Sequence, residues 1–169
     1  MIAELKEEYA KGRRDFRGVD LSGANLTWCN LSGIDLSEAN LQNAKLSSTI
    51  FRQAKMIGAN LEKANLRAVD LSGVDLRGAC LKDADLVRAD LIGTNLEKAD
   101  LRGANLDKAI IRNVNLRFAN LCQANLQKLN LKKVDFQGAN LKEANLAQSL
   151  IKSASLQNES LIIQEVVVK

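Results

Sequence analysis

The sequence predicts an all-β solenoid, in which the chain turns a corner every five residues around one narrow core. An apolar residue recurs at every fifth position from Phe16 to Leu161, which makes 30 consecutive pentapeptides without an insertion, and 24 of these residues are leucines. The chain has no proline and only 4% aromatic residues, although 46% of it is apolar. Small and medium apolar side chains suit a narrow core repeated many times better than one thick core.

The consensus of the pentapeptides is A-(N/D)-L-x-x, where the first position is usually Ala, the second usually Asn or Asp, and the two x positions are mostly polar. A period of five fits neither a helix nor a flat strand, so the chain has to turn corners to keep its leucines on one side. The alanine and the leucine are two residues apart and point inward, while the other three residues point outward. The alanine position has to stay small because two large side chains would overfill the coil. The Asn or Asp suits a turn, where its side chain binds backbone N–H groups and tolerates unusual backbone angles.

Units such as Ala64-Asn65-Leu66, Ala84-Asp85-Leu86 and Ala104-Asn105-Leu106 resemble the pentapeptide-repeat family, and the resemblance covers residues 14–161. It implies a right-handed quadrilateral parallel β-helix with four pentapeptides in each coil, and so about seven to eight coils within a repeat domain at residues 13–161. At a strand spacing of ~4.8 Å the rod is roughly 36 Å long.

The two ends of such a solenoid need covers for their strand edges. Residues 1–12 are expected to form a capping α-helix, since Ile2, Leu5 and Tyr9 fall on one helical face and Gly12 suits the end of a helix. The apolar run 162–169 has two interpretations, a last strand folded over the final coil or a contact in a C-terminal homodimer, which the resemblance supports because some members associate end to end. This candidate dimer contact consists of Leu161, Ile162, Ile163, Val166, Val167 and Val168.

The residues that usually carry catalysis are scarce in this chain. It has no histidine, the commonest general base and metal ligand, and no Gly-rich phosphate loop. We therefore expect no enzyme, no cofactor and no metal site. With 20-residue coils, Asp15 would lie beside Asp35 and Asp70 beside Asp90. Each pair has a functional interpretation, as a cation site or an acid/base pair, and a structural one, as surface residues that cap turns.

The cysteine content is typical of a protein in a reducing compartment, and no targeting signal is recognised in the sequence. The chain has three cysteines, an odd number: Cys29, Cys80 and Cys122. Cys29 falls at an inward position. Cys80 and Cys122 are two coils apart, and this distance of ~10 Å is too long for a disulfide. The first residues do not read as a secretion signal, and no segment is long and apolar enough to span a membrane. The expected location is the cytoplasm.

One outward column breaks the repeat pattern without breaking its register. Ile50, Ile110 and Leu150 occupy the Asn/Asp position and share one corner when a coil has 20 residues. Apolar groups rimmed by charge are typical of contact sites. The alternative is tolerated drift at a corner. The candidate partner face comprises Ile50, Arg52, Ile92, Ile110, Arg112, Lys132, Leu150 and Lys152.

These observations predict a non-catalytic scaffold that binds an unidentified protein. The alternative comes from the resemblance, because some pentapeptide-repeat proteins resemble duplex DNA in size and negative charge and bind type II topoisomerases, but this chain has a net charge of +4. Residues 108–169 hold nine basic residues against four acidic ones. Aromatic residues are nevertheless sparse, so nucleic-acid binding is not expected. Whether the least regular stretch, residues 47–56, distorts its coil is left open.

Overall fold

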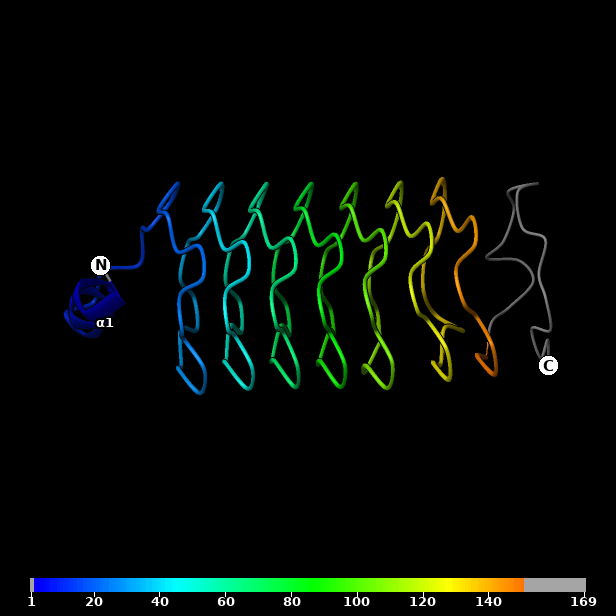
Figure 1. Ribbon diagram of the computed structural model, residues 1–169, viewed down its shortest axis with the longest axis horizontal. Coiled ribbons are helices and arrows are strands. Elements are labelled where there is room, and N and C mark those ends of the chain that lie inside the picture. Colours follow the sequence, from blue (N-terminus) through cyan, green and yellow to red (C-terminus); the bar gives the residue numbers. More distant parts are fainter. Residues whose placement is uncertain (1, 151–169) are drawn as a thin grey trace.

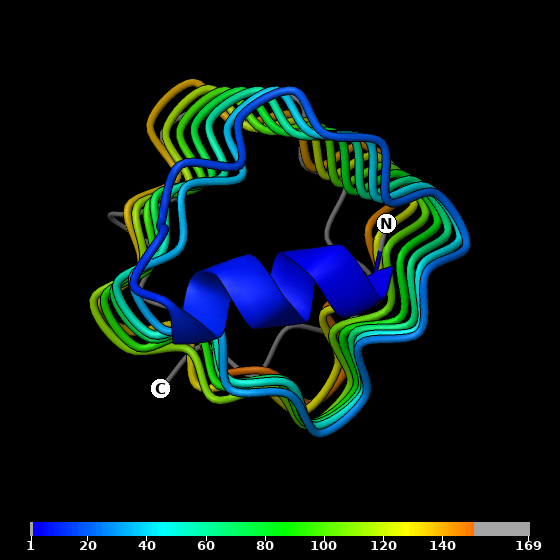
Figure 2. The ribbon, with the colours of Figure 1, turned by 90° about the vertical axis from the view of Figure 1, so that its left-hand side faces the viewer.

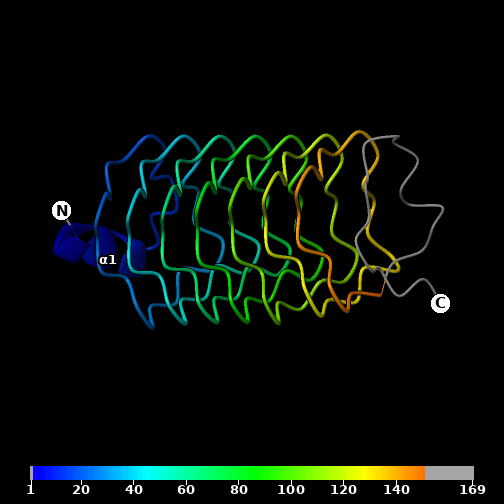
Figure 3. The same cartoon turned by 45° about the vertical axis from the view of Figure 1, so that its right-hand side comes forward.

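The computed structural model describes residues 2–150 and shows one helix followed by a stack of coils (Figure 1). The helix, α1, spans Ile2–Ala10. In the stack, the residue at the Asn/Asp position pairs in parallel with the residue 20 positions further on, as Asp15 pairs with Asp35, so each coil holds four pentapeptides. Seen obliquely, the coils repeat one outline along the axis (Figure 3). The predicted all-β solenoid, a quadrilateral parallel β-helix with a short N-terminal helix, is confirmed.

The helix α1 lies across the open end of the first coil (Figure 2). Its Leu5 side chain is buried in the core, and the Tyr9 hydroxyl donates a hydrogen bond to the Ser32 carbonyl at 2.8 Å. The chain leaves the helix at Gly12, whose φ of 101° and hydrogen bond to the Tyr9 carbonyl suit a helix end. The Arg14 guanidinium then stacks on the Tyr9 ring at 3.9 Å. Coverage by α1 keeps the first coil from exposing a free strand edge.

The turns lie at the two x residues that follow each central residue. Their hydrogen bond runs from the next inward residue back to the central carbonyl, as from the Ala24 N–H to the Leu21 carbonyl at 3.0 Å. Lys133 is the one second x residue between 18 and 148 that lacks a positive φ. Asn and Asp stand before the central residue, and their Oδ1 accepts the N–H two residues on, as Asp20 does from Ser22 at 3.0 Å. Their expected N–H bonding is therefore seen, but placing them in the turn itself was wrong.

The core is a set of stacked apolar columns. From Leu21 to Leu106 every central residue is at most 2% exposed. Hydroxyl groups at the small inward position are also buried, and each donates to a backbone carbonyl; Thr49 binds the Leu26 carbonyl at 2.8 Å and Thr94 the Leu71 carbonyl at 2.9 Å. Buried hydroxyls with a partner are tolerated in an apolar core.

Residues 47–56 do not distort their coil. The Ile50 N–H donates to the Cys29 carbonyl at 2.9 Å, and the Phe51 N–H donates to the Asp70 carbonyl at 2.8 Å, as equivalent residues do in the other regular coils. Phe51 is fully buried. A phenylalanine at the central position is therefore accommodated without loss of backbone hydrogen bonds.

The irregular part lies further along, between residues 108–114 and 127–135, and we call it the ladder break. Every residue at the Asn/Asp position within residues 2–150 forms the expected parallel pairs, except that Ile110 does not pair with Asn130. The turn bonds that should close at Val114 and Leu129 are missing as well. The yellow coils in Figure 1 depart from the outline of the green ones. The N–H groups that lack their coil-to-coil acceptor belong to Lys108, Ile111, Asn113, Asn130 and Asp135.

A leucine in a small position lies at the centre of the ladder break. Leu129 occupies the inward site that Ala109 fills one coil earlier and Ser149 one coil later. Its N–H donates to the Ser149 hydroxyl at 3.1 Å, and that hydroxyl donates in turn to the Leu126 carbonyl. The serine hydroxyl thus bridges a turn that the larger side chain holds open.

Size alone does not open a turn. Ile34 stands at an equivalent inward position, yet its N–H still donates to the Leu31 carbonyl at 3.2 Å. Isoleucine branches at Cβ, close to the backbone, whereas leucine branches one carbon nearer the coil axis. We attribute the ladder break to this difference in shape.

Candidate interaction face

The structure places Ile50, Ile110 and Leu150 of the candidate partner face at the Asn/Asp position on one side of the rod, and Ile92 in the column two residues later. Parallel pairs join Ile50 to Asp70, Asp70 to Asp90 and Asp90 to Ile110. Leu150 continues the same column through its pair with Asn130. Lys152 lies outside the described residues, as does the candidate dimer contact. The side of the coil predicted from the 20-residue register is therefore the side on which these residues lie.

The exposed apolar surface of the candidate partner face is smaller than the sequence suggested. Ile110 is 45% exposed and Ile92 is 36% exposed, whereas Ile50 and Leu150 are half-buried. Only the two isoleucines present much apolar area to solvent. They stand on adjacent coils, so they form one small apolar surface rather than a long strip.

Arg52 is held by an ion pair within the coil stack. Its Nε donates to the Asp70 carboxylate, which also accepts the Ser72 N–H at 3.0 Å. Partial burial raises the pKa of Asp70, but the Ser72 hydrogen bonds and the Arg52 charge outweigh it and hold the pKa below its ordinary value. Arg52 is therefore less available to a partner than the sequence suggests.

Arg112 and Lys132 differ from Arg52 in having no ion pair within residues 2–150. By the 20-residue repeat they occupy equivalent positions on adjacent coils, directly after the column that contains Ile110. The exposed and unpaired part of the candidate partner face is thus its later part, around Ile110.

Sequence reasoning missed a second basic column on the same side of the rod. Arg88, Lys108 and Lys128 occupy the second x position of three adjacent coils, directly before the Ile110 column, and all three are exposed. Only Lys108 has an acidic neighbour, with its Nζ 3.9 Å from Asp107 Oδ2, among the described residues. A reading of the second x position in steps of 20 residues would have found this column.

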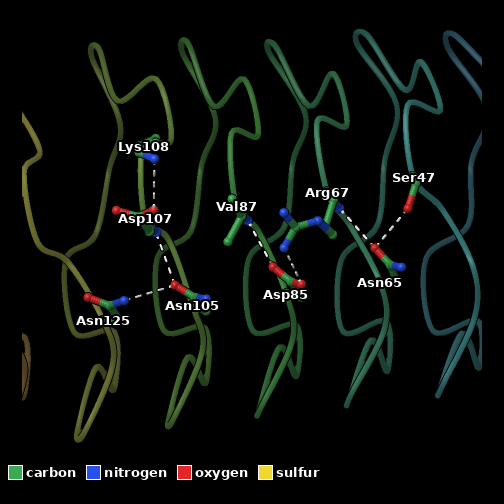
Figure 4. Close-up of polar contacts among 9 residues, drawn as sticks. All are labelled: Ser47, Asn65, Arg67, Asp85, Val87, Asn105, Asp107, Lys108 and Asn125. Carbon is green, nitrogen blue, oxygen red and sulfur yellow. Dashed lines mark hydrogen bonds and ion pairs between the residues drawn. The ribbon is translucent and has the colours of Figure 1, made fainter.

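On the neighbouring side of the rod, polar side chains form hydrogen bonds with one another and with the backbone. In Figure 4 Asn65, Asp85, Asn105 and Asn125 stand in one column, and Asn125 Nδ2 donates to Asn105 Oδ1 at 3.0 Å. Asp85 accepts the Val87 N–H at 3.1 Å and Arg67 Nη1 at 2.9 Å. These contacts leave few free polar groups for a ligand on that side.

Asp107 is the exception on that side. Its N–H donates to Asn105 Oδ1 at 3.1 Å, but its own Oδ1 is buried without a hydrogen-bond partner within the described residues (Figure 4). It lies at the edge of the ladder break, beside the Lys108 N–H, which lacks its coil-to-coil acceptor within the described residues. The polar contacts of the column therefore become incomplete where the ladder breaks.

Two of the stacked carboxylates, Asp15 and Asp70, are each bound by an arginine. Arg17 donates to Asp15 at 2.7 and 2.9 Å, and this pairing holds the pKa of Asp15 at about 2. Asp75 is held in the same way by Arg77. In residues 2–150 no group of three or more His, Cys, Asp or Glu residues is arranged to hold a metal ion.

The cysteines and exposed aromatic residues do not gather into a site. Cys29 packs against the core, and Cys80 and Cys122 are free thiols. Trp28 is 80% exposed and Phe118 is 49% exposed, on separate corners of the rod. Within residues 2–150 no helix has the length and apolar character that crossing a membrane requires.

Comparisons with known proteins give one family match. The family model for pentapeptide repeats matches in eight copies between residues 15 and 158. The curated proteins include no match.

Several solved structures are similar. The pentapeptide-repeat protein alr5209 from Nostoc PCC 7120 shares 40% identity over 69% of this chain and 89% of its own, with a TM-score of 0.37. HetL, from the cyanobacterium Nostoc sp. strain PCC 7120 and involved in the regulation of heterocyst differentiation, shares 26% identity over 88% of this chain and 96% of its own, with a TM-score of 0.44. QnrB1, a plasmid-mediated fluoroquinolone resistance protein, shares 20% identity over 82% of this chain and 75% of its own, with a TM-score of 0.70, and shows likeness of fold alone.

Proposed function

Because this chain belongs to the pentapeptide-repeat family, we propose that it is a non-catalytic scaffold that binds a partner protein on the side of the rod around Ile110. The observation that carries the proposal is the exposed pair Ile110 and Ile92, 45% and 36% exposed, beside Arg112 and Lys132, which form no ion pair within residues 2–150. Apolar groups rimmed by charge are common at contact sites between proteins.

The coil stack gives such a surface a physical advantage. In the regular coils the residue at the Asn/Asp position pairs with the coils on both sides, as Asp90 does with Asp70 and Ile110. The spacing between the coils that carry Ile92 and Ile110 is therefore fixed before binding, although Ile110 itself lacks its pair with Asn130. A preorganised surface loses less conformational entropy on binding than a flexible loop does. Ile92 and Ile110 are also β-branched and have few rotamers to lose.

The chemistry of the side chains supports a role without catalysis. The chain has no histidine. Asp75 and Asp100 each pair with the arginine two residues further on, and these hydrogen bonds hold their pKa values below the ordinary range. A carboxylate kept ionised in this way is a poor general acid near neutral pH.

The charge of the chain argues against the DNA-mimic alternative. A mimic of duplex DNA needs a strongly acidic surface, whereas this chain has a net charge of +4. The likeness to QnrB1, at 20% identity, adds nothing to that alternative beyond the shared fold.

A pair of matched variants tests the proposal. Ile110→Asp/Arg112→Glu places charge on the proposed surface, and Phe118→Asp/Lys98→Glu makes the same change in charge on another corner, where both side chains are also exposed. In affinity capture from the native host's lysate, we expect the wild type and the Phe118/Lys98 variant to retain the same protein and the Ile110/Arg112 variant to lose it. Retention of that protein by all three would show that the site lies elsewhere.

A further inference from the structure

The outward side chains around Ile110 form a grid of three rows, which we call the basic patch. Each row comes from one coil and contributes three outward positions, in the order second x, Asn/Asp position and first x. The Asp90–Ile110 pair aligns the first two rows at ~4.8 Å, and the 20-residue repeat places the third row beyond them, across the missing Ile110–Asn130 pair. The rows are Arg88, Asp90 and Ile92; Lys108, Ile110 and Arg112; and Lys128, Asn130 and Lys132.

Most cations of the basic patch have no partner within the chain. Among residues 2–150, ion pairs are absent for Arg88, Arg112, Lys128 and Lys132, and Lys108 has only a 3.9 Å contact with Asp107. The single acidic residue in the grid, Asp90, accepts the Ile92 N–H at 3.0 Å. Five cations therefore surround two exposed isoleucines with little compensation from the protein itself.

The same surface covers the ladder break. By the 20-residue repeat, Lys108 and Lys128 occupy equivalent positions, as do Arg112 and Lys132, on the two coils between which backbone hydrogen bonds are missing. Like charges directly opposite each other destabilise neighbouring strands. Bound carboxylates would reduce this repulsion, so an anionic partner is expected to tighten the coils beneath it.

From the grid, and resting on the proposed function, we infer that the basic patch binds an acidic amphipathic segment of the partner protein, with carboxylates against the two cation columns and apolar side chains against Ile92 and Ile110. Charge complementarity requires the acid, and the central isoleucines require the apolar side chains. Nucleic acid fits less well because the patch has no aromatic side chain on which bases could stack. The row spacing is close to the ~5–6 Å between side chains three or four residues apart on a helix.

A binding experiment with defined probes tests this inference. The probe is a dye-labelled amphipathic peptide of Glu and Leu at helical spacing, about 16 residues long so that it can form a helix. Polyglutamate of the same length tests charge alone, and a single-stranded oligothymidylate tests nucleic acid. Fluorescence anisotropy is measured at about 0.15 M salt, where long-range attraction between exposed charges is screened.

The variant Lys108→Glu/Lys128→Glu reverses two charges of the basic patch, and Lys63→Glu/Lys98→Glu makes the same net change at exposed sites outside it. We expect the wild type to bind the Glu–Leu peptide more tightly than polyglutamate. The first variant should bind it about tenfold more weakly and the second within about twofold of the wild type. Amide exchange at Ile111 and Asn113 should slow when the peptide is bound.

Four results would overturn the inference: no binding of the peptide, an equal loss in both variants, tighter binding of the oligothymidylate, or unchanged exchange at Ile111 and Asn113 with peptide bound. The inference and the proposed function can fail separately. If lysate capture depends on Ile110 and Arg112 but the peptide does not bind, the scaffold stands and the acidic chemistry is wrong.

Discussion

The regular coils up to residue 106 and the ladder break at 108–135 follow the same five-residue pattern but differ in their contacts. Three arginines pair with the aspartate 18 residues further on. In the regular part Arg67 Nη1 lies 2.9 Å from Asp85 Oδ2, whereas across the ladder break Arg117 Nη1 lies 3.7 Å from Asp135 Oδ2. The backbone bonds show the same contrast, since they are complete on one side and interrupted on the other.

The difference shows which side chains the two inward positions accept without loss of backbone hydrogen bonds. Phe51 is larger than leucine, but it occupies a central position and keeps its coil intact. Leu129 is an ordinary core residue in an unusual place, the small inward position, and the ladder breaks around it. The small inward position therefore accepts β-branched side chains such as Ile34 with the backbone bonds intact, whereas the leucine at position 129 coincides with their loss.

The largest expected effect comes from emptying the regular core. Leu86→Ala should lower the free energy of unfolding by about 2–5 kcal/mol, because Leu86 is 1% exposed between complete coils that cannot close over a cavity. Ile111→Ala should cost less, because the open coil beside Ile111 can relax into the space. Urea unfolding of the two variants measures the difference. Equal losses would mean that the ladder break is as rigid as the regular coils.

The second prediction concerns the bridging hydroxyl. Ser149→Ala removes both the acceptor for the Leu129 N–H and the donor to the Leu126 carbonyl, so it should cost about 1–3 kcal/mol. The matched change in the regular part is Thr94→Val, which should cost about 1 kcal/mol or less, because the Leu71 carbonyl keeps its bond from the Val74 N–H. Chemical denaturation compares them. A smaller loss for Ser149→Ala would show that the turn closes without its serine.

The third prediction tests the cause of the ladder break. Leu129→Val removes the branch that extends toward the coil axis, so the turn at residues 126–129 should close and the coil-to-coil bonds should return. The net change in stability should stay near 1 kcal/mol, since the lost methylene, about 0.8 kcal/mol, offsets the regained bonds. Slower amide exchange at Ile111 and Asn113 is the decisive readout, with Ile34→Val as control. Unchanged exchange would assign the break to the stacked cations instead.

The five-residue period was enough to predict the solenoid, because no other regular structure keeps an apolar residue at that spacing on one side. It could not place the turns, since the left-handed backbone falls on residues of many types, from Gly23 to Trp28. For the candidate site, the 20-residue register aligned Ile110 with Asp90, but exposure depends on neighbours that the pattern does not show. Leu129 visibly violates the small position, but the pattern does not show whether the backbone absorbs the larger side chain, since Ile34 is accommodated with its turn bond intact.

The smallest expected effect is on acid stability. Arg102 donates to Asp100 at 2.6 and 2.8 Å and holds the pKa of Asp100 below its ordinary 3.8. Because the folded pKa is the lower one, this pair stabilises the fold above about pH 4, and the contribution disappears as pH falls through the folded pKa. Arg102→Gln should therefore reduce the stability lost between pH 5 and pH 2, by a small amount because both side chains are partly exposed. Arg117→Gln, which removes the longer pair across the ladder break, should change this loss still less; a larger change would show that the Arg117 pair closes in solution.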